Sequence, residues 1–370
     1  MIKILYLIDR IKAAGAQKHL IELIKGLDKT KFQPQLCLLE KSSALANLGI
    51  PVYCLNVKRI YDISGINGLS QLVRLIRKEK FDIVHSYLFS ENILGTIAAK
   101  MAGVKATITS RRDTGMLVQG GWEHILAYRF TNRWVDKIVC VSDAVKKVAL
   151  TKEKVSSEKL VVIYNGVDVD KFKVQSSKFK VKASLGIKED EFVVGMIANF
   201  SWVKGHKEFI EAAQIVLREV PNTKFLLIGE GPLKESWQLS AISCQNRDKL
   251  LFLGSRQDIS ELISIMDISV NASYSEGMSN TILESMASGI PVVATAVDGN
   301  LETVADNQTG FLVPSKDSQA LAQAIIKILR DEALKKRLGE NARQRAMGEF
   351  SFSGMVEAFE KLYEAELTRK

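Results

Sequence analysis

The 370-residue chain lacks the features that would place it in several common protein classes. It contains no run of 18 or more uninterrupted apolar residues, so no membrane-spanning helix is expected. The apolar opening Ile2–Ile8 is short and stops at Asp9, which predicts a buried first strand of a cytosolic protein and not a signal peptide. The cysteines form no C-x-x-C pair, which argues against a zinc site or a disulfide framework and predicts small buried thiols. They are Cys37, Cys54, Cys140 and Cys244.

Motifs for binding a dinucleotide, a divalent metal ion or a nucleic acid are missing as well. No G-x-G-x-x-G follows an expected strand, which argues against an NAD-dependent oxidoreductase. No Asp-x-Asp directly follows such a strand as an anchor for Mg²⁺ or Mn²⁺, so neither a metal nor another cofactor is expected. The cationic residues are not interleaved with aromatics in any known nucleic-acid-binding motif, so nucleic acid is not an expected partner.

What the chain does contain is a repeated pattern of strands and helices. It is 46% hydrophobic and 25% charged, as in globular enzymes, and its length predicts two domains. Short β-branched runs alternate with amphipathic segments, which predicts a doubly wound, parallel α/β fold. The expected strands are 2–8, 34–39, 51–55, 82–87, 105–110, 137–141, 160–164, 192–198, 224–229, 250–254, 268–271 and 291–295.

A polar Lys/Ser-rich stretch at 171–182 divides the pattern into two series. We therefore expect Rossmann-like domains at 1–175 and 176–350, with 351–370 as a C-terminal helix that packs back on the first. Residues 1–175 hold 28 Lys and Arg against 16 Asp and Glu, while the remainder holds 23 against 26. The basic first half predicts an anionic partner, such as a lipid surface or a phosphate-bearing substrate.

The densest signal for a binding site lies between Ser275 and Pro291. A strand should end near Asn271, a Gly-containing loop follows, and Ser279 is an expected N-cap of a helix that ends before Gly289. Backbone N–H groups and the positive end of the helix dipole suit a diphosphate at such a position. On that helix the apolar residues share one face, and Glu284 should point away from it, toward a cleft or solvent.

These residues resemble the signature of the family 4 retaining glycosyltransferases of GT-B fold, in which two Rossmann-like domains face each other across a cleft. Glu276 and Glu284 are separated by seven residues and are followed by Met-Ala-Ser-Gly-Ile-Pro-Val-Val-Ala-Thr. Further segments agree in the same order along nearly the whole chain. They are Ala14-Gly15-Ala16, Asp82-Ile83-Val84-His85, Val141-Ser142-Asp143-Ala144, Asn165-Gly166-Val167-Asp168, Lys204-Gly205-His206, Gly229-Glu230-Gly231-Pro232-Leu233 and Thr309-Gly310-Phe311-Leu312-Val313-Pro314.

The resemblance implies a role for each matching position. Glu284 would accept hydrogen bonds from the ribose hydroxyls of the donor, and Glu276 would bind the ring hydroxyls of the donor sugar as a catalytic residue. Lys204 matches the diphosphate lysine and would stabilise the charge that develops on the leaving group. Gly15 would let first-domain backbone amides approach the phosphate or the transferred sugar. The remaining donor-binding positions are Asn199, Gly229, Gly254, Gly277, Met278, Ser279 and Asn280.

The chain departs from the family pattern at two places. Asn199 stands where an arginine commonly accompanies the diphosphate lysine, and a neutral amide cannot supply a bidentate cationic fork. Where relatives carry a histidine near the acceptor, this chain has Arg111 and Arg112, which would bind a phosphate of the acceptor or donor, or pair with Asp113. His85 is the nearest other imidazole and the expected catalytic histidine.

The resemblance implies transfer of a sugar from a nucleotide diphosphate, more often UDP than GDP, with retention and without a metal. The resemblance also implies that no protein nucleophile takes part, and that the acceptor displaces the diphosphate on the same face while the departing phosphate helps to deprotonate it. A saccharide or lipid-linked acceptor of bacterial surface-glycan synthesis fits the basic first half, which would also attract the anionic inner face of the plasma membrane. Lys12, Lys18 and Lys25 are the candidate lysines for this membrane contact.

The alternative function is that of a non-catalytic nucleotide-sugar-binding subunit of a transferase complex, which Asn199 favours. The sugar, the base, the acceptor, the linkage and the oligomeric state stay open at this point.

Overall fold

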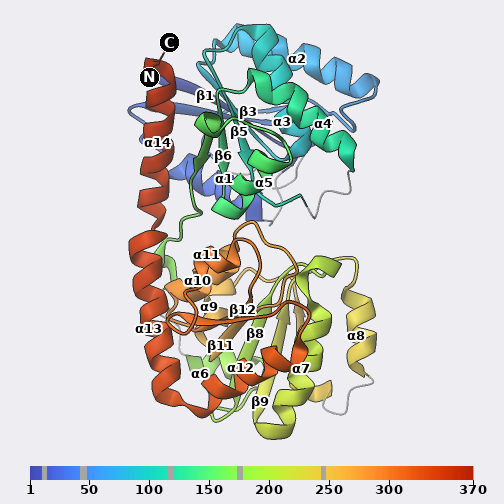
Figure 1. Cartoon of the computed structure of the whole chain (residues 1–370), viewed down its shortest axis with the longest axis vertical. Coiled ribbons are helices and arrows are strands. Elements are labelled where there is room, and N and C mark those ends of the chain that lie inside the picture. The colour runs from blue at the N-terminus through green and yellow to red at the C-terminus, as the bar shows by residue number, and fades with distance from the viewer. Residues whose placement is uncertain (11–14, 42–47, 116–120, 173–177, 243–246, 370) are drawn as a thin grey trace. The chain divides into compact units, whose positions relative to one another are not determined.

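The computed structural model describes residues 1–10, 15–41, 48–115, 121–172, 178–242 and 247–369, and the chain forms two compact units (Figure 1). Unit 1 contains Met1–Asn165 and Ser353–Lys370, and unit 2 contains Gly166–Phe352. The boundary between the units at Asn165 and Gly166 therefore lies before the polar stretch 171–182, where the sequence pattern placed it. Part of that stretch is a helix, and its Val181 is buried in the core of unit 2.

Unit 1 is built on one parallel sheet of seven strands in the order β3-β2-β1-β4-β5-β6-β7. Its strands are β1 (Ile2–Ile8), β2 (Phe32–Leu38), β3 (Val52–Cys54), β4 (Ile83–Tyr87), β5 (Ala106–Arg111), β6 (Lys137–Cys140) and β7 (Leu160–Val162). Its helices are α1 (Gly15–Gly26), α2 (Ile63–Glu79), α3 (Phe89–Ala102), α4 (Trp122–Thr131), α5 (Asp143–Thr151) and α14 (Phe352–Thr368), with the 3₁₀ turns η1 (Asn132–Trp134) and η2 (Ser157–Lys159).

Alternate residues of the unit 1 strands face two different helical layers, as the period of a strand requires. Leu5, Leu7 and Val84 are fully buried in a core that α2 and α3 cover. On the opposite face the Tyr6 hydroxyl donates to the Tyr363 hydroxyl of α14 at 3.0 Å, so the C-terminal helix completes the core of the first unit.

Unit 2 is built on a parallel sheet of six strands in the order β10-β9-β8-β11-β12-β13. Its strands are β8 (Phe192–Ile197), β9 (Thr223–Ile228), β10 (Leu250–Gly254), β11 (Ile268–Asn271), β12 (Val292–Thr295) and β13 (Gly310–Val313). Its helices are α6 (Lys178–Ser184), α7 (His206–Glu219), α8 (Lys234–Ile242), α9 (Ile259–Ser264), α10 (Asn280–Ala287), α11 (Asn300–Thr303), α12 (Ser318–Arg330) and α13 (Glu332–Glu349), with the 3₁₀ turns η3 (Val169–Phe172), η4 (Trp202–Lys204) and η5 (Arg247–Lys249).

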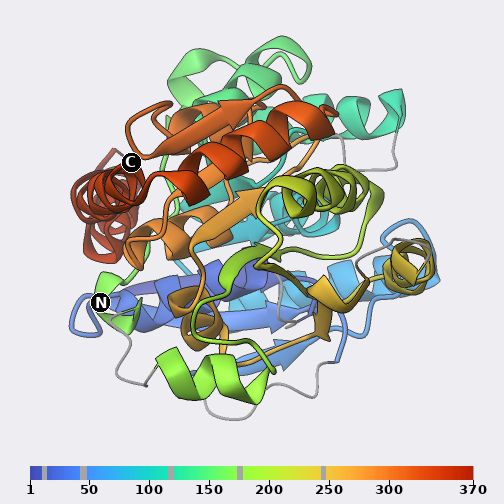
Figure 2. The same ribbon diagram turned by 90° about the horizontal axis from the view of Figure 1, so that it is seen from below.

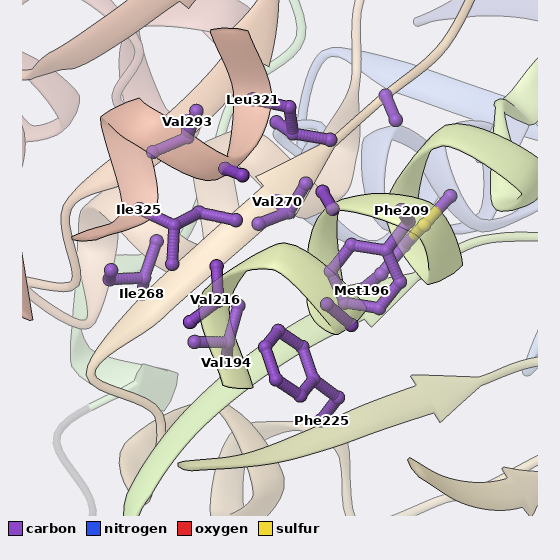
Figure 3. Packing of buried hydrophobic residues seen from close by; sticks show 14 of the residues in the cluster. Val194, Met196, Phe209, Val216, Phe225, Ile268, Val270, Val293, Leu321 and Ile325 are labelled. Atoms are coloured by element: carbon purple, nitrogen blue, oxygen red, sulfur yellow. The ribbon is translucent and has the colours of Figure 1, made fainter. Parts of the chain in front are cut away.

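The larger core of unit 2 lies between the sheet and the neighbouring helices α7 and α12 (Figures 1 and 2). Figure 3 shows Phe209 of α7 and Ile325 of α12 among side chains of the strands, including Val194 and Phe225. The other face of the sheet packs on α6 and α9. Both faces are therefore covered, which explains the continuous apolar runs of these parallel strands.

The expected doubly wound α/β fold is confirmed, and every expected strand overlaps an observed one. The additional strand β13 (Gly310–Val313) was not among the expected strands. Among the described residues, no helix combines the length and the apolar composition that crossing a bilayer requires.

Candidate functional site

The loop between β11 and α10 in unit 2 has the local structure that its sequence predicts. Ser279 is the N-cap of α10, with its side chain accepting a hydrogen bond from the Ile282 backbone N–H at 3.4 Å. The Asn271 amide of β11 donates to the Ser279 hydroxyl at 3.2 Å, which fixes the cap against the end of the strand. Gly289 has a φ of +72° just after the helix, as expected for a helix end. The positive end of the α10 dipole therefore points into this loop.

The two charged residues that the sequence singled out lie together at this loop. The Lys204 ammonium is 2.6 Å from a carboxylate oxygen of Glu276, and the side chains are 17% and 13% exposed. The Ser273 hydroxyl donates to the same carboxylate oxygen at 3.0 Å. A lysine from the loop after β8 and a glutamate from the loop after β11 thus meet beside the N-terminus of α10. The arrangement can offer a cation to a phosphate oxygen and a carboxylate to a hydroxyl.

A turn after β12 holds the backbone of this loop in place. The Asp298 carboxylate accepts hydrogen bonds from the Ser275 hydroxyl at 2.5 Å and from the Glu276 backbone N–H at 3.3 Å. The Gly299 N–H donates to the Glu276 carbonyl at 3.0 Å, and a Cβ at Gly299 would lie 2.0 Å from the Gly277 carbonyl oxygen. Asp298 and Gly299 were not among the predicted site residues, although an Asp-Gly pair after a strand is a turn signal.

The glycines and the amide expected at the donor site lie at the carboxyl ends of neighbouring strands. The Gly229 N–H donates to the Gly254 carbonyl at 2.9 Å, and both residues have positive φ angles. A Cβ at Gly229 would lie 2.1 Å from the Ala198 carbonyl oxygen, so glycine is required for this approach of backbones. Asn199 follows Ala198 and is exposed. These positions share one edge of the sheet with Lys204 and Glu276.

Glu284 lies on α10 as predicted, but it does not face solvent. It is 8% exposed, because η3, α9 and α13 pack around this short helix. Met278 and Ser279, at the start of the helix, are each 7% exposed. The sequence pattern of α10 alone separates an apolar face from a polar one, but it cannot show which later elements cover the polar face.

His206, next to the Lys204 loop, is a neutral part of the core. Its ring stacks on Phe200 with 4.2 Å between centroids, and the residue is 2% exposed. Burial, together with the positive charge of Lys204, lowers the pKa of His206 to about 4. The imidazole is therefore uncharged at neutral pH and leaves Lys204 as the cation of this loop.

In unit 1 the structure argues against a catalytic role for His85. The side chain is fully buried, with Nδ1 2.8 Å from the Tyr363 hydroxyl and Nε2 2.9 Å from the Ser110 hydroxyl. Burial, with a smaller contribution from the charge of Arg112, lowers its pKa to about 3. Both ring nitrogens are occupied inside the core, so this imidazole has no free position for a substrate proton. The expectation fails because α14, which is remote in sequence, covers β4.

Arg111 also belongs to the interior, which corrects its expected role in acceptor binding. Its Nε and Nη2 donate to Glu153 at 3.0 to 3.2 Å, and Nη1 donates to Thr109 at 3.1 Å. Its guanidinium lies 3.6 Å from the centre of the Tyr128 ring. The residue is 5% exposed and all three of its side-chain nitrogens are engaged. A substrate phosphate would have to displace Glu153 to reach it.

Arg112 and Gly15 remain candidates for contacts in unit 1. Arg112 is half-buried, donates to Asn165 at 2.6 Å, and has a buried Nη1 with no hydrogen-bond partner. Gly15 is exposed at the first position of α1. Lys12, Ala14 and Cys244 lie outside the described residues. Of the other cysteines, Cys37 and Cys140 are buried and Cys54 is half-buried, all as free thiols.

Each half of the chain matches a family model of glycosyltransferases. The family model of glycosyl transferases group 1 matches residues 177–345, and that of Glycosyltransferase Family 4 matches residues 13–171. The UDP-Gal:alpha-D-GlcNAc-diphosphoundecaprenol alpha-1,3-galactosyltransferase of Escherichia coli is 29% identical over 328 residues, which are 85% of this chain and 82% of that protein. The capsular polysaccharide biosynthesis glycosyltransferase CapM of Staphylococcus aureus is 28% identical, covering 81% of each chain.

A solved structure shows the same fold. The Anabaena protein Alr3699/HepE, crystallised with UDP and glucose, superposes with a TM-score of 0.87 over 99% of this chain and 100% of its own, at 23% identity.

The buried pair of Arg111 and Glu153 yields a test of the structural role of this arginine. Arg111→Ala should lower the free energy of unfolding by about 3–5 kcal/mol, because Glu153 would keep a buried charge without its partner. Urea denaturation followed by circular dichroism measures this change. The exposed Arg74 of α2 is the control, and Arg74→Ala should change stability by less than about 0.5 kcal/mol. An Arg111→Ala protein of normal stability that had lost acceptor binding would restore the original expectation.

Proposed function

Because the chain is a family 4-like glycosyltransferase of GT-B fold, we propose that it transfers a sugar from a nucleotide diphosphate to a saccharide or lipid-linked acceptor, with retention. The observation that carries this proposal is the pair of Lys204 and Glu276 beside the N-terminus of α10. Together they provide the two kinds of group that a nucleotide sugar needs, a cation for the diphosphate and a carboxylate for the sugar hydroxyls.

Lys204 stabilises the leaving group in this proposal. As the bond between the anomeric carbon and the diphosphate breaks, negative charge grows on the phosphate oxygens. A lysine and a helix N-terminus that are already in position stabilise this charge more than they stabilise the intact donor. Lys204 turns from Glu276 to the diphosphate, and the freed carboxylate accepts hydrogen bonds from the donor sugar. Asn199, in place of the usual arginine, donates a neutral hydrogen bond at most.

Retention follows from a displacement on one face of the sugar. The acceptor oxygen bonds to the anomeric carbon on the side from which the diphosphate departs, and the acceptor proton passes to a phosphate oxygen. No protein base is required for this step. The enclosed imidazole of His85, with its lowered pKa, is consistent with that assignment.

The donor and the acceptor are proposed from the relatives. The Escherichia coli relative is named for UDP-galactose and for an acceptor linked to diphosphoundecaprenol, and the Staphylococcus aureus relative for capsular polysaccharide. We propose that this chain likewise uses a UDP-sugar, in preference to a GDP-sugar, as its donor. Its acceptor would belong to surface-glycan synthesis. The site of action would be the cytoplasmic face of the membrane, to which the basic unit 1 would be attracted.

The alternative, a non-catalytic subunit that binds a nucleotide sugar, rests on Asn199 alone. An enzyme slowly hydrolyses its donor when no acceptor is present, whereas a pure binder releases the donor unchanged. Release of UDP from a UDP-sugar therefore separates the two functions.

The two glutamates should have separable effects on donor binding and turnover. Glu284→Ala should weaken donor binding by about tenfold to hundredfold, because it removes charge-assisted bonds to the ribose. Glu276→Ala should mainly lower kcat, because its contacts strengthen as the sugar gains positive charge. A thermal-shift titration with UDP- and GDP-sugars measures binding, and UDP release measures turnover. The control is Glu211→Ala, which alters an exposed glutamate of α7. Unchanged binding and activity in Glu284→Ala would contradict the assignment.

Lys204→Ala should lower turnover by about a hundredfold, because leaving-group stabilisation is lost. The control is Lys207→Ala, since Lys207 is exposed on the same segment and pairs with Glu211 at 3.8 Å. The variant Lys204→Ala/Glu276→Ala should lose less activity than the product of the two single losses, because each residue already depends on the other. Full activity in Lys204→Ala would defeat the proposed role.

EDTA should leave turnover unchanged, because Lys204 and the N-terminus of α10 would stabilise the negative charge on the leaving diphosphate without a metal ion. Within the described parts of the chain, no group of three His, Cys, Asp or Glu residues is placed to hold a metal ion. The chain does contain an Asp-x-Asp sequence, at Asp168 and Asp170 in the segment after β7. The Asp168 carboxylate, however, lies 3.5 Å from the Lys171 ammonium and pairs with it. UDP release with and without EDTA tests this expectation. A strict requirement for added Mn²⁺ or Mg²⁺ would show that the diphosphate is bound differently.

A further inference from the structure

The turn after β12 contains a residue in an unfavourable backbone conformation. Asp298 has a φ of +38°, in the left-handed region, which costs a residue with a Cβ more than it costs glycine. The glycine of this turn, however, is the next residue, Gly299. Strained backbone is retained in folded proteins where the surrounding structure requires a particular side chain or geometry, often at a functional site. The conformation of Asp298 therefore points to a role for its side chain.

The turn holds Glu276 by both of its main-chain groups. The Glu276 N–H donates to the Asp298 carboxylate at 3.3 Å, and the Gly299 N–H donates to the Glu276 carbonyl at 3.0 Å. The Ser275 hydroxyl donates to the same Asp298 oxygen, Oδ2, at 2.5 Å. All three bonds end on the backbone of Glu276 or on the side chain of Ser275, so they fix where Glu276 lies without occupying its carboxylate.

The turn is itself anchored to the ends of two neighbouring strands. The Asn300 side chain is fully buried, and its amide donates to the Thr295 carbonyl of β12 at 3.1 Å and to the Asn271 side-chain oxygen of β11 at 3.2 Å. The Thr295 hydroxyl donates to the Ser273 carbonyl, at the start of the Glu276 loop, at 2.5 Å. The position of the Glu276 backbone is therefore set by the carboxyl ends of β11 and β12.

The carboxylate of Glu276 has different partners, and the proposed reaction removes one of them. The Lys204 ammonium and the Ser273 hydroxyl lie 2.6 and 3.0 Å from it. When a donor binds, Lys204 turns to the diphosphate, and the ion pair that orients Glu276 is lost. The bonds from the turn reach Glu276 through its backbone, so they can persist through this exchange.

We propose that Asp298 is a positioning residue for Glu276. It keeps the Glu276 backbone fixed while the carboxylate exchanges Lys204 for the hydroxyls of the donor sugar. A carboxylate that is already in place stabilises developing positive charge most effectively, because no reordering is needed during the reaction. The inference rests on the proposed function for what Glu276 does, but the hold on its backbone exists without a substrate.

Hydrogen–deuterium exchange of the purified full-length protein tests this hold in the absence of a donor. Asp298→Ala should raise the exchange rate of the Glu276 amide by about tenfold or more, because the N–H loses its acceptor and the loop opens more often. Asp298→Asn keeps a side-chain oxygen at the same place, so the amide should exchange nearly as in the wild type. Amides of α12 should be unaffected in both variants, which would show that the change is local.

Donor hydrolysis tests whether Asp298 acts through Glu276. Asp298→Ala should lower kcat by about tenfold and leave the affinity for the UDP-sugar nearly unchanged, because the expected diphosphate and ribose contacts belong to other residues. Asp298→Asn should retain most of the turnover. In a Glu276→Ala background Asp298→Ala should lower kcat no further, because the carboxylate that it positions is gone. In the control background Glu211→Ala the loss should again be about tenfold.

Asp298→Gly separates positioning from stability. It removes the strained conformation together with the carboxylate, so the midpoint of urea denaturation should stay close to that of the wild type while kcat falls as it does in Asp298→Ala. The matched control is Asn307→Gly, since Asn307 is an exposed residue of unit 2 with a φ of +59°. This variant should keep the turnover of the wild type.

The proposal is overturned if the Glu276 amide exchanges in Asp298→Ala as it does in the wild type. It is also overturned if Asp298→Gly keeps full turnover, or if Asp298→Ala lowers kcat equally in the presence and absence of the Glu276 carboxylate. A wild-type protein that binds a UDP-sugar but releases no UDP would instead contradict the proposed function. In that case the exchange measurement alone would decide whether Asp298 holds Glu276.

Discussion

The ion pair between Lys204 and Glu276 joins two loops that leave the second sheet at different strands. Its formation depends on the backbone around it. Gly205 has a φ of +68°, and a Cβ there would lie 2.0 Å from the Ala272 carbonyl oxygen, so the loops can approach only at a glycine. The Tyr274 N–H donates to the Val203 carbonyl at 2.7 Å and fixes this approach. The pair is therefore held by the fold on both sides, which is what a site needs if its charges are to be in position before a substrate binds.

Much of the fold could be predicted from sequence because parallel strands covered on both faces are continuous apolar runs. The loop before α10 could be predicted for a similar reason. Its N-cap at Ser279 and its helix end at Gly289 depend on interactions within a few residues, and these leave local signals. Strand β13 and helix α6 were not predicted. Helix α6 lies mostly in the polar stretch 171–182, and Val181 is its buried residue, so it has no apolar stripe that a sequence pattern could show.

Residues of the candidate site could be predicted where a sequence motif fixes their position. They could not be predicted where burial determines which groups a side chain contacts. Lys204 and Glu276, which the resemblance assigns to one donor site, lie 2.6 Å apart. Arg111 and His85 are polar residues at strand ends, and such residues are usual site candidates, yet both satisfy partners inside the fold. Their partners, Glu153 and Tyr363, come from distant segments. Asp298 supports the loop of Glu276 in the same way, across 22 residues. No local pattern reveals such pairings, because they form between elements that meet only in the folded chain.

The division of unit 1 between the two ends of the chain has a consequence for biosynthesis. Phe359 and Tyr363 of α14 are fully buried in unit 1, where the Tyr363 hydroxyl contacts both Tyr6 and His85. Domains generally fold as the ribosome delivers them, the N-terminal one first. Here the part of the first sheet around Tyr6 and His85 stays uncovered until α14 has been made, whereas every segment of unit 2 precedes Ser353 in the chain. The second unit can therefore complete its core before the first, and a ribosome that stops before α14 leaves a chain with an unfinished N-terminal half.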